Sequence, residues 1–585
     1  MRQFIKFHLL AIIFAVIIGM AVVAPTISSV FRIGFEDFRG VFPIWNDDEQ
    51  HYLVRARDIV DGNNFLGNAY LAEHKKDVFI QPPIAEQILV FPAQIFPISV
   101  PALFVAYDFI FPFASVFLLY FLFLAVIPSR FASAFASFLF HLFFLNSFNR
   151  PVNPQFNFLF LIIGLLLIAN LSGLSSDEKM KKAPLLHFVF GIVFAVSFFI
   201  SPYVWTSLAV LYGLTLCGIF ISKKASLSSL RENFFYFLVP ALIGIIPYAF
   251  FLRNASSGAY YAESLRRFGL ISNHFPACFA NVGIVFLAMI GLFLVRRKIE
   301  NKNTFYFSFS LLLSAVIFNW QNVFTGTYLQ FSSHYYLFTV LFVAVSLAPA
   351  MRVIFRNFDK RKDFAAFLMI LTVFSAVLYK QIGDMKKGLI AMGGVSSGQM
   401  QEIEKDRAVF DWFNKNTAKE SVVYVIGERQ GELLPVYTAN NVYFNYYAGF
   451  YAVSNREMKE RWLRQNIFYS PFNQEFIRNS QSVFMGSTYV DSYQNWKVRQ
   501  KLKGYFGMPT EKKEQVPNEV INDVVLSYRS LQKEDPFTAI KKYRVDYFLV
   551  NISDDNGKRA NEYLSKNKNV SKSARIDNFV IFRVQ

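Results

Sequence analysis

Long apolar runs alternate with short polar segments over roughly the first two thirds of the chain, and most runs approach the ~20 residues that a helix needs to cross a bilayer. This pattern predicts about eleven membrane-spanning helices. We expect them at 4–24, 101–127, a segment ending near 148, 156–174, both sides of the polar segments 201–205, 253–281 and 320–333, and 364–380. Residues 1–382 are therefore predicted to form a polytopic α-helical membrane domain.

The first long polar segment, residues 25–97, carries two amphipathic helix patterns. One lies in residues 45–63, where apolar side chains recur at helical spacing. Its apolar face holds Leu53, Ala56, Ile59 and Val60, and its polar face holds Arg55, Arg57, Asp58 and Asp61. Such a helix is expected to lie flat on the bilayer surface. A second short surface helix is expected after Pro82 and Pro83, which interrupt the backbone pattern.

The last part of the chain, residues 383–585, mixes helical and strand patterns and lacks long apolar runs. An amphipathic helix is expected at 401–414, and strands at 421–427, at the end of 542–551 and in the closing NFVIFRV. This pattern predicts a soluble α/β domain. It contains no P-loop and no dinucleotide-binding glycine pattern, so nothing in it predicts a nucleotide site.

Basic residues fall in alternate short connections between the predicted spans. They occupy 129–130, 177–182, 223–224, 296–298 and 352–362, and Arg2 and Lys6 precede the first span. Because cytoplasmic loops are enriched in Lys and Arg, the N-terminus is assigned to the cytoplasm, and residues 25–97 and the C-terminal domain to the extracytoplasmic side. The N-terminal run also resembles a signal peptide, but its cleavage signal is weak, so we expect an uncleaved first span.

The composition agrees with a membrane protein. Of 585 residues, 54% are hydrophobic and 18% aromatic, and the formal net charge is +18. A charge of this size could indicate nucleic-acid binding, but the basic residues lie in loops between spans and form no continuous patch. We therefore exclude nucleic acid as a partner and expect a lipid bilayer.

Three acids, Asp47, Asp48 and Glu49, begin the first amphipathic pattern. Capping explains most such triplets, since Asn46 and Glu49 have capping-box spacing and acids complement a helix N-terminus. The functional alternative is a general base: a carboxylate beside a membrane can take a proton from an acceptor hydroxyl while a donor sugar loses a lipid phosphate. Nucleotide sugars are cytoplasmic and this segment is predicted outside, so the donor would be lipid-linked.

The sequence DEQHYLVRARDI, residues 48–59, resembles the first external loop of the GT-C glycosyltransferases, most closely the aminoarabinose transferases of lipid A and the protein O-mannosyltransferases. Those enzymes carry an Asp-Glu pair after the first span. In the aminoarabinose type, further residues match Tyr52, Ala56, Arg57 and Ile59, and a later Pro-Pro element matches Pro82–Pro83. The motif covers residues 48–83, and the rest of the chain matches in architecture.

This resemblance implies a GT-C-like fold and the transfer, with inversion, of a sugar from a polyprenyl-phosphate carrier to a glycan, lipid or protein acceptor. It implies that Asp48 is the catalytic carboxylate and that Glu49 orients substrate. Asp47, His51 and Tyr52 are assigned to substrate binding beside them. A Trp-Trp-Asp motif, typical of the related oligosaccharyltransferases, is absent from the sequence, which argues against transfer of a whole glycan to asparagine.

One position departs from the family pattern: Gln81 stands where the aminoarabinose transferases have a phosphate-binding lysine. Another cation must then bind the phosphate, and arginine suits bidentate phosphate contacts. The candidates predicted on the same side are Lys75, Lys76, Arg150, Arg253, Arg266 and Arg267. Each could instead be an ordinary interfacial anchor. His334 could bind phosphate or relay a proton, or could belong to an aromatic belt with its tyrosine neighbours.

Two questions stay open at this point. Asp47, Asp48, Glu49 and His51 could ligate a divalent cation, Mg or Mn, but their spacing does not demand one. The function could also be that of a flippase or transporter of lipid-linked sugars, or of a non-catalytic envelope assembly protein with the same fold. A transporter is disfavoured because the predicted spans are almost free of charge, with Asp108 as the main exception, and show no repeated halves.

Overall fold

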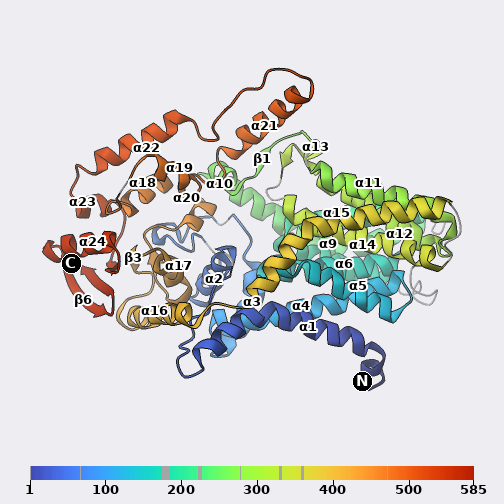
Figure 1. The fold of residues 1–585 in the computed structure, drawn as a ribbon, viewed down its shortest axis with the longest axis horizontal. Helices are drawn as coiled ribbons and strands as arrows, with labels where there is room; N and C mark the ends of the chain where they lie inside the picture. Colours follow the sequence, from blue (N-terminus) through green and yellow to red (C-terminus); the bar gives the residue numbers. More distant parts are fainter. Residues whose placement is uncertain are drawn as a thin grey trace.

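The computed structural model describes residues 2–45, 47–65, 67–78, 80–173, 183–221, 227–276, 278–328, 332–356, 361–470 and 472–585. The basic connections predicted at 177–182 and 223–224 lie outside these residues, as does Asn46. The described chain is mostly helical and forms a helical bundle with an α/β domain at one end (Figure 1).

Apolar helices build the bundle, and every segment predicted as a span falls on one of them. They are α1 (Arg2–Ile33), α4 (Val100–Val126), α5 (Arg130–Phe143), α6 (Asn157–Leu171), α7 (Ala183–Ile200), α8 (Pro202–Ile221), α9 (Leu227–Ser256), α11 (Phe279–Leu294), α12 (Lys302–Asn319), α14 (Ser332–Arg356) and α15 (Arg361–Ala391). A helix satisfies its own backbone hydrogen bonds, which is why apolar chain can cross a bilayer in this form.

Seven helices in the described part of the chain are long and apolar enough to cross a membrane, and the bent pair Phe367–Tyr379 and Gln381–Ala391 within α15 would make an eighth. The seven are α1, α4, α6 with its preceding turn η3 (Pro151–Phe156), α7, α8, α9 and α14. The helices α5 and α11 are shorter, with 14 and 16 residues. The protein is thus a multi-pass membrane protein, while eleven crossings and the sidedness stay predictions.

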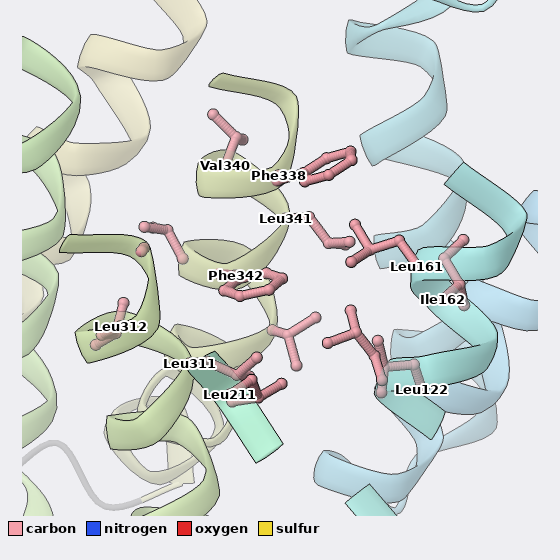
Figure 2. Close-up of a cluster of buried hydrophobic side chains, with 14 of the residues drawn as sticks. Leu122, Leu161, Ile162, Leu211, Leu311, Leu312, Phe338, Val340, Leu341 and Phe342 are labelled. Atoms are coloured by element: carbon pink, nitrogen blue, oxygen red, sulfur yellow. The ribbon is translucent and has the colours of Figure 1, made fainter. Parts of the chain in front are cut away.

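Close helix packing holds the bundle together. A Cβ atom added at Gly244 of α9 would lie 2.5 Å from the backbone of Ala195 in α7, so the two backbones meet where only glycine fits. Small residues at such crossings are typical of membrane helices. Figure 2 shows the bundle core, where leucine, isoleucine, valine and phenylalanine side chains of α4, α6, α8, α12 and α14 point toward one another.

The C-terminal domain is built on a five-stranded sheet of order β4-β3-β5-β7-β6. Its strands are β3 (Val422–Ile426), β4 (Asn441–Val442), β5 (Tyr547–Asn551), β6 (Val570–Ile576) and β7 (Phe579–Val584). β3 is parallel to β4 and β5, whereas β7 pairs antiparallel with β5 and β6. The predicted strands at 421–427, 542–551 and the C-terminal end are confirmed as β3, β5 and β7.

Helices cover this sheet and extend beyond it. They are α16 (Ser397–Asn416), α17 (Glu428–Tyr437), α18 (Asn455–Gln465), α19 (Gln474–Asn479), α20 (Gln481–Met485), α21 (Val490–Tyr505), α22 (Asn518–Leu531), α23 (Pro536–Ile540) and α24 (Asp555–Lys566). The helix predicted at 401–414 is confirmed within α16. The expected domain boundary between residues 382 and 383 lies inside α15, just after the bend that follows Tyr379.

The first polar segment forms α2 (Asp47–Val60) and α3 (Ile84–Ile95), and protein, not a bilayer surface as predicted, covers the apolar face of α2. Its apolar residues Leu53, Ala56 and Ile59 belong to one buried core with residues of α3, α4, α16 and α17. Figure 1 shows α2 beside α17, between the sheet and the bundle. The prediction was wrong because an amphipathic pattern shows that a face is covered but not by what, and here α3, α4 and the distant C-terminal domain cover it.

Hydrogen bonds also tie this segment to the C-terminal domain. The Val442 amide of β4 donates to the Tyr70 carbonyl at 3.1 Å, and the Gln50 side chain of α2 donates to the Glu432 carbonyl of α17 at 2.8 Å. The segment therefore folds as part of the α/β domain and carries α2 to the end of the bundle.

Candidate functional site

Two buried ion pairs fix α2 at the end of the bundle. Arg55 Nε lies 2.5 Å from Glu86 Oε1 of α3, and both side chains are about 3% exposed. Asp58 pairs with Lys75, again with both side chains buried. Arg55 and Asp58 were predicted on a water-facing surface, and the structure shows both of them buried in protein. Burying charges is costly unless they are paired, so these contacts constrain the position of the helix strongly.

Consecutive acids at the start of α2 face different surroundings, because successive helical residues point about 100° apart. The Asp48 side chain is 57% exposed and forms an ion pair with Arg150, which lies just before η3. Glu49 is buried, and its carboxylate accepts a hydrogen bond from the Trp45 amide at 3.4 Å. The side chain of Asp47 lies outside the described residues.

A cavity of about 380 Å³ opens beside the Asp48–Arg150 pair. One part of its wall is polar and comes from the segment before α6; another part is aromatic and aliphatic and comes from α8 and α14. The lining residues are Asp48, Phe144, Asn146, Ser147, Asn149, Arg150, Asn153, Pro154, Asn157, Ser201, Tyr203, Tyr336, Leu337, Phe338, Gln381 and Asp384. The cavity therefore lies where α2 meets the ends of the bundle helices.

Polar atoms in this wall are buried without a partner among the described residues. They are Arg150 Nε, a donor, and Asn157 Oδ1, an acceptor. A buried polar atom without a hydrogen bond costs about 1–3 kcal/mol. Native proteins tolerate such atoms where a ligand or a water molecule supplies the missing hydrogen bond. Arg150 thus holds Asp48 through Nη1, while its Nε is a buried donor without a hydrogen bond among the described residues.

Burial governs the chemistry of Glu49, which does not line the cavity. Burial raises the pKa of the Glu49 carboxyl above its ordinary value, and the Trp45 amide and the Arg150 charge offset this only in part. The carboxyl of Asp108 in α4 lies close enough to interact with it electrostatically and accepts a hydrogen bond from Gln155 Nε2 at 2.7 Å. Glu49 is therefore placed behind Asp48, between α2 and the bundle.

The raised pKa of Glu49 predicts a pH dependence that a single substitution removes. A carboxyl whose pKa is raised by folding stabilises the folded state below the unfolded value, about 4.3, and that contribution is lost as the pH rises through the folded value. Glu49→Gln does not titrate. The thermal midpoint of the wild-type protein should therefore fall relative to Glu49→Gln as the pH is raised. If the thermal midpoints of the wild-type protein and Glu49→Gln differ by the same amount over the whole pH range, folding does not raise the pKa of Glu49.

His51 and Tyr52 belong to different surroundings. His51 is buried, with Nδ1 3.3 Å from the Tyr70 hydroxyl and its ring stacked 5.0 Å from Tyr447. Burial, with the Arg55 charge, holds the pKa of His51 well below its ordinary range. Tyr52 is half-buried and makes a side-chain hydrogen bond with Asn153 of the cavity wall. Tyr52 thus supports the cavity, whereas His51 packs against the C-terminal domain.

The predicted phosphate-binding cations are not brought together. Arg150 lines the cavity, and Lys75 is paired with Asp58. Arg267 is buried and donates to the carbonyls of Gly449, at 2.8 Å, and of Val453, which anchors α10 (Tyr261–Phe268) to the C-terminal domain. The remaining candidates Lys76, Arg253 and Arg266 are exposed, and Gln81 is half-buried in the turn before α3. The His334 side chain lies outside the described residues.

Most of the cavity wall was not predicted as part of the site. Asn146 and Asn153 lie in the connection between two predicted spans, Asn157 was predicted within the span 156–174, and Gln381 and Asp384 were not considered. The available signal was a dense cluster of asparagines, with an arginine and prolines, between two apolar runs. From Pro151 onward these polar residues fall in the candidate span Pro151–Leu171, where polar backbone and side chains occur when they line a cavity.

A divalent metal stays a prediction. Over the residues whose placement is described, there is no cluster of three or more His, Cys, Asp or Glu side chains that could hold an ion. Asp48 and Glu49 point into different environments, so they do not form a ready pair of ligands. The Asp47 side chain lies outside the described part.

No protein-family model and no curated protein matches this chain.

Proposed function

We propose that the protein is an integral membrane glycosyltransferase that moves a sugar from a polyprenyl-phosphate carrier to an acceptor hydroxyl on the extracytoplasmic side. The observation that carries the proposal is the ion pair of Asp48 and Arg150 at a cavity between the first turn of α2 and the ends of the bundle helices. The resemblance of residues 48–83 to the first external loop of GT-C enzymes supports the same function.

The cavity offers what such a transfer needs. A carboxylate exposed at the mouth can accept a proton, and a guanidinium with a buried, unpartnered Nε can donate to a phosphate oxygen. The wall formed by Tyr336, Leu337 and Phe338 belongs to a helix apolar enough to cross the membrane, and so suits the apolar part of a lipid-linked donor. If Arg150 binds the phosphate, Gln81 does not have to perform the phosphate-binding role of the lysine that the family has at this position.

In the proposed reaction, Asp48 takes the proton from the acceptor hydroxyl as the hydroxyl oxygen attacks the anomeric carbon. The bond from that carbon to the phosphate oxygen breaks, and polyprenyl phosphate leaves with the electron pair. Arg150 stabilises the charge that develops on the phosphate. One displacement of this kind inverts the anomeric centre. Glu49 supports the start of α2 from the buried side and makes no bond to the reacting atoms.

An assay with radiolabelled polyprenyl-phospho-sugars tests the proposal, with purified protein in lipid nanodiscs. Asp48→Asn is expected to lower donor consumption by roughly 10²–10⁴-fold, the usual effect of losing a general base. The matched control is Asp411→Asn, which removes the acid of another Asp–Arg pair on the surface of α16. Asp411→Asn should retain the wild-type rate.

Other outcomes contradict the proposal. Equal donor consumption by wild type and Asp48→Asn would show that Asp48 is not the general base. If no donor is consumed across a panel of sugars and acceptors, a lipid translocation assay in vesicles distinguishes the rivals. Translocation would favour a flippase, and its absence a non-catalytic assembly protein.

A further inference from the structure

The helix α21 and the turn that follows it form a projection at the edge of the C-terminal domain, here called the α21 hairpin (residues 490–513). The helix α13 (Gln321–Thr325) lies at the end of the bundle nearest the C-terminal domain. Figure 1 shows that the turn of the hairpin reaches the same position as α13 along the long axis of the molecule. The hairpin therefore reaches back toward the level of the bundle and not away from it.

The tip of this hairpin exposes large apolar side chains. Tyr505 and Phe506 are each 75% exposed, and Met508 is also exposed. Leu502 and Val498 lie one and two turns earlier on the face of α21 that ends at Tyr505, and both are exposed too. An apolar stripe that continues into an exposed apolar tip is unusual for a surface that faces only water.

Basic residues accompany the apolar ones. Residues 490–513 contain six Lys or Arg and two acidic residues, and one of the acids, Glu511, pairs with Lys503 at 3.3 Å. The cations are Lys497, Arg499, Lys501, Lys503, Lys512 and Lys513. An apolar face with flanking Lys and Arg is typical of helices that bind anionic bilayer surfaces.

Aromatic residues mark the same level on two separate elements. Phe324 belongs to α13, the helix that Figure 1 shows level with the turn of the hairpin, and is 81% exposed. Aromatic side chains gather where a membrane meets water, so this level fits a membrane interface.

We propose that the α21 hairpin docks on the bilayer surface beside the bundle. Tyr505, Phe506 and Met508 enter the interfacial region, and the surrounding cations contact anionic lipid headgroups. The C-terminal domain is then held at two places, by the core around α2 and by the lipid surface at the hairpin. This inference does not depend on the proposed function, because it concerns a surface remote from Asp48 in the chain and uses only exposure, charge and position.

Spin labelling of the full-length protein in nanodiscs that contain anionic lipid tests the proposal. Neither Cys217 nor Cys278 forms a disulfide, and both would be replaced by serine. A nitroxide is then attached at Phe506→Cys or, as the control, at Leu526→Cys in α22, which is also apolar and is 63% exposed. Collision rates of each label with oxygen, which partitions into lipid, and with a water-soluble nickel chelate report its depth.

The label at position 506 is expected to collide more often with oxygen and less often with the nickel chelate than the label at position 526. Replacing Lys501 and Lys503 by glutamate should return it toward the values of the control. Equal collision rates at the two positions would overturn the proposal. Protection from both reagents at 506 would also overturn it, because that result indicates a protein surface covering the hairpin.

Discussion

Replacing Arg55 by methionine is expected to lower the free energy of local unfolding of α2 by about 3–5 kcal/mol, because it leaves the Glu86 carboxylate buried without a partner. Hydrogen exchange of the α2 amides would then accelerate by roughly a hundredfold to several thousandfold. Mass spectrometry of the protein in nanodiscs measures that rate peptide by peptide. The effect should extend to α3, because the pair joins the two helices.

Two further variants separate the buried pair from the helix itself. Arg57→Met removes an ion pair with Asp61 on the more exposed side of the same helix and should cost about 1 kcal/mol or less. The double variant Arg55→Met with Glu86→Leu removes both charges and should recover most of the loss. If the double variant is as unstable as the single one, the instability comes from altered packing and the ion-pair explanation fails.

Substitution of Arg150 should produce the largest effect on activity of any cation in the chain. Arg150→Gln removes the guanidinium that pairs with Asp48 and carries a buried Nε without a partner. Under the proposed function, kcat/KM for a polyprenyl-phospho-sugar should fall roughly a hundredfold or more, as when a charge-stabilising donor is lost. Arg150→Lys should recover only part of this, since lysine keeps the charge but not the planar set of donors.

A matched variant controls for general effects of losing an arginine. Arg407→Gln breaks the surface pair with Asp411 in α16 and should leave kcat/KM unchanged. If Arg150→Gln and Arg407→Gln behave alike, the phosphate is bound elsewhere. Exposed Lys76, Arg253 and Arg266 would then be the next residues to substitute.

Helix positions in the membrane part were predictable from sequence because the bilayer imposes one requirement, an apolar run of sufficient length. The strands β3, β5 and β7 were predictable for a similar reason, as short apolar runs between polar segments. The surroundings of α2 were not. Its Leu53, Ala56 and Ile59 pattern is the same whether lipid or protein covers the face, and the covering residues lie far away in sequence.

Within the candidate site, Asp48 was predicted from the sequence as the catalytic carboxylate, and Arg150 was one of six cations predicted to bind phosphate. It could not select Arg150, because the pairing depends on how the turn before η3 meets α2. It also could not separate Arg267 from Arg266, which are neighbours in sequence. Only the fold shows that Arg267 is buried against the carbonyls of the C-terminal domain while Arg266 is exposed.

The most direct test of the account is a density map of the protein bound to polyprenyl phosphate. The phosphate is expected in the cavity beside Asp48, with one of its oxygens at a hydrogen-bonding distance of about 2.7–3.2 Å from the Arg150 guanidinium. An empty cavity, with the lipid phosphate bound at another cation, would contradict it.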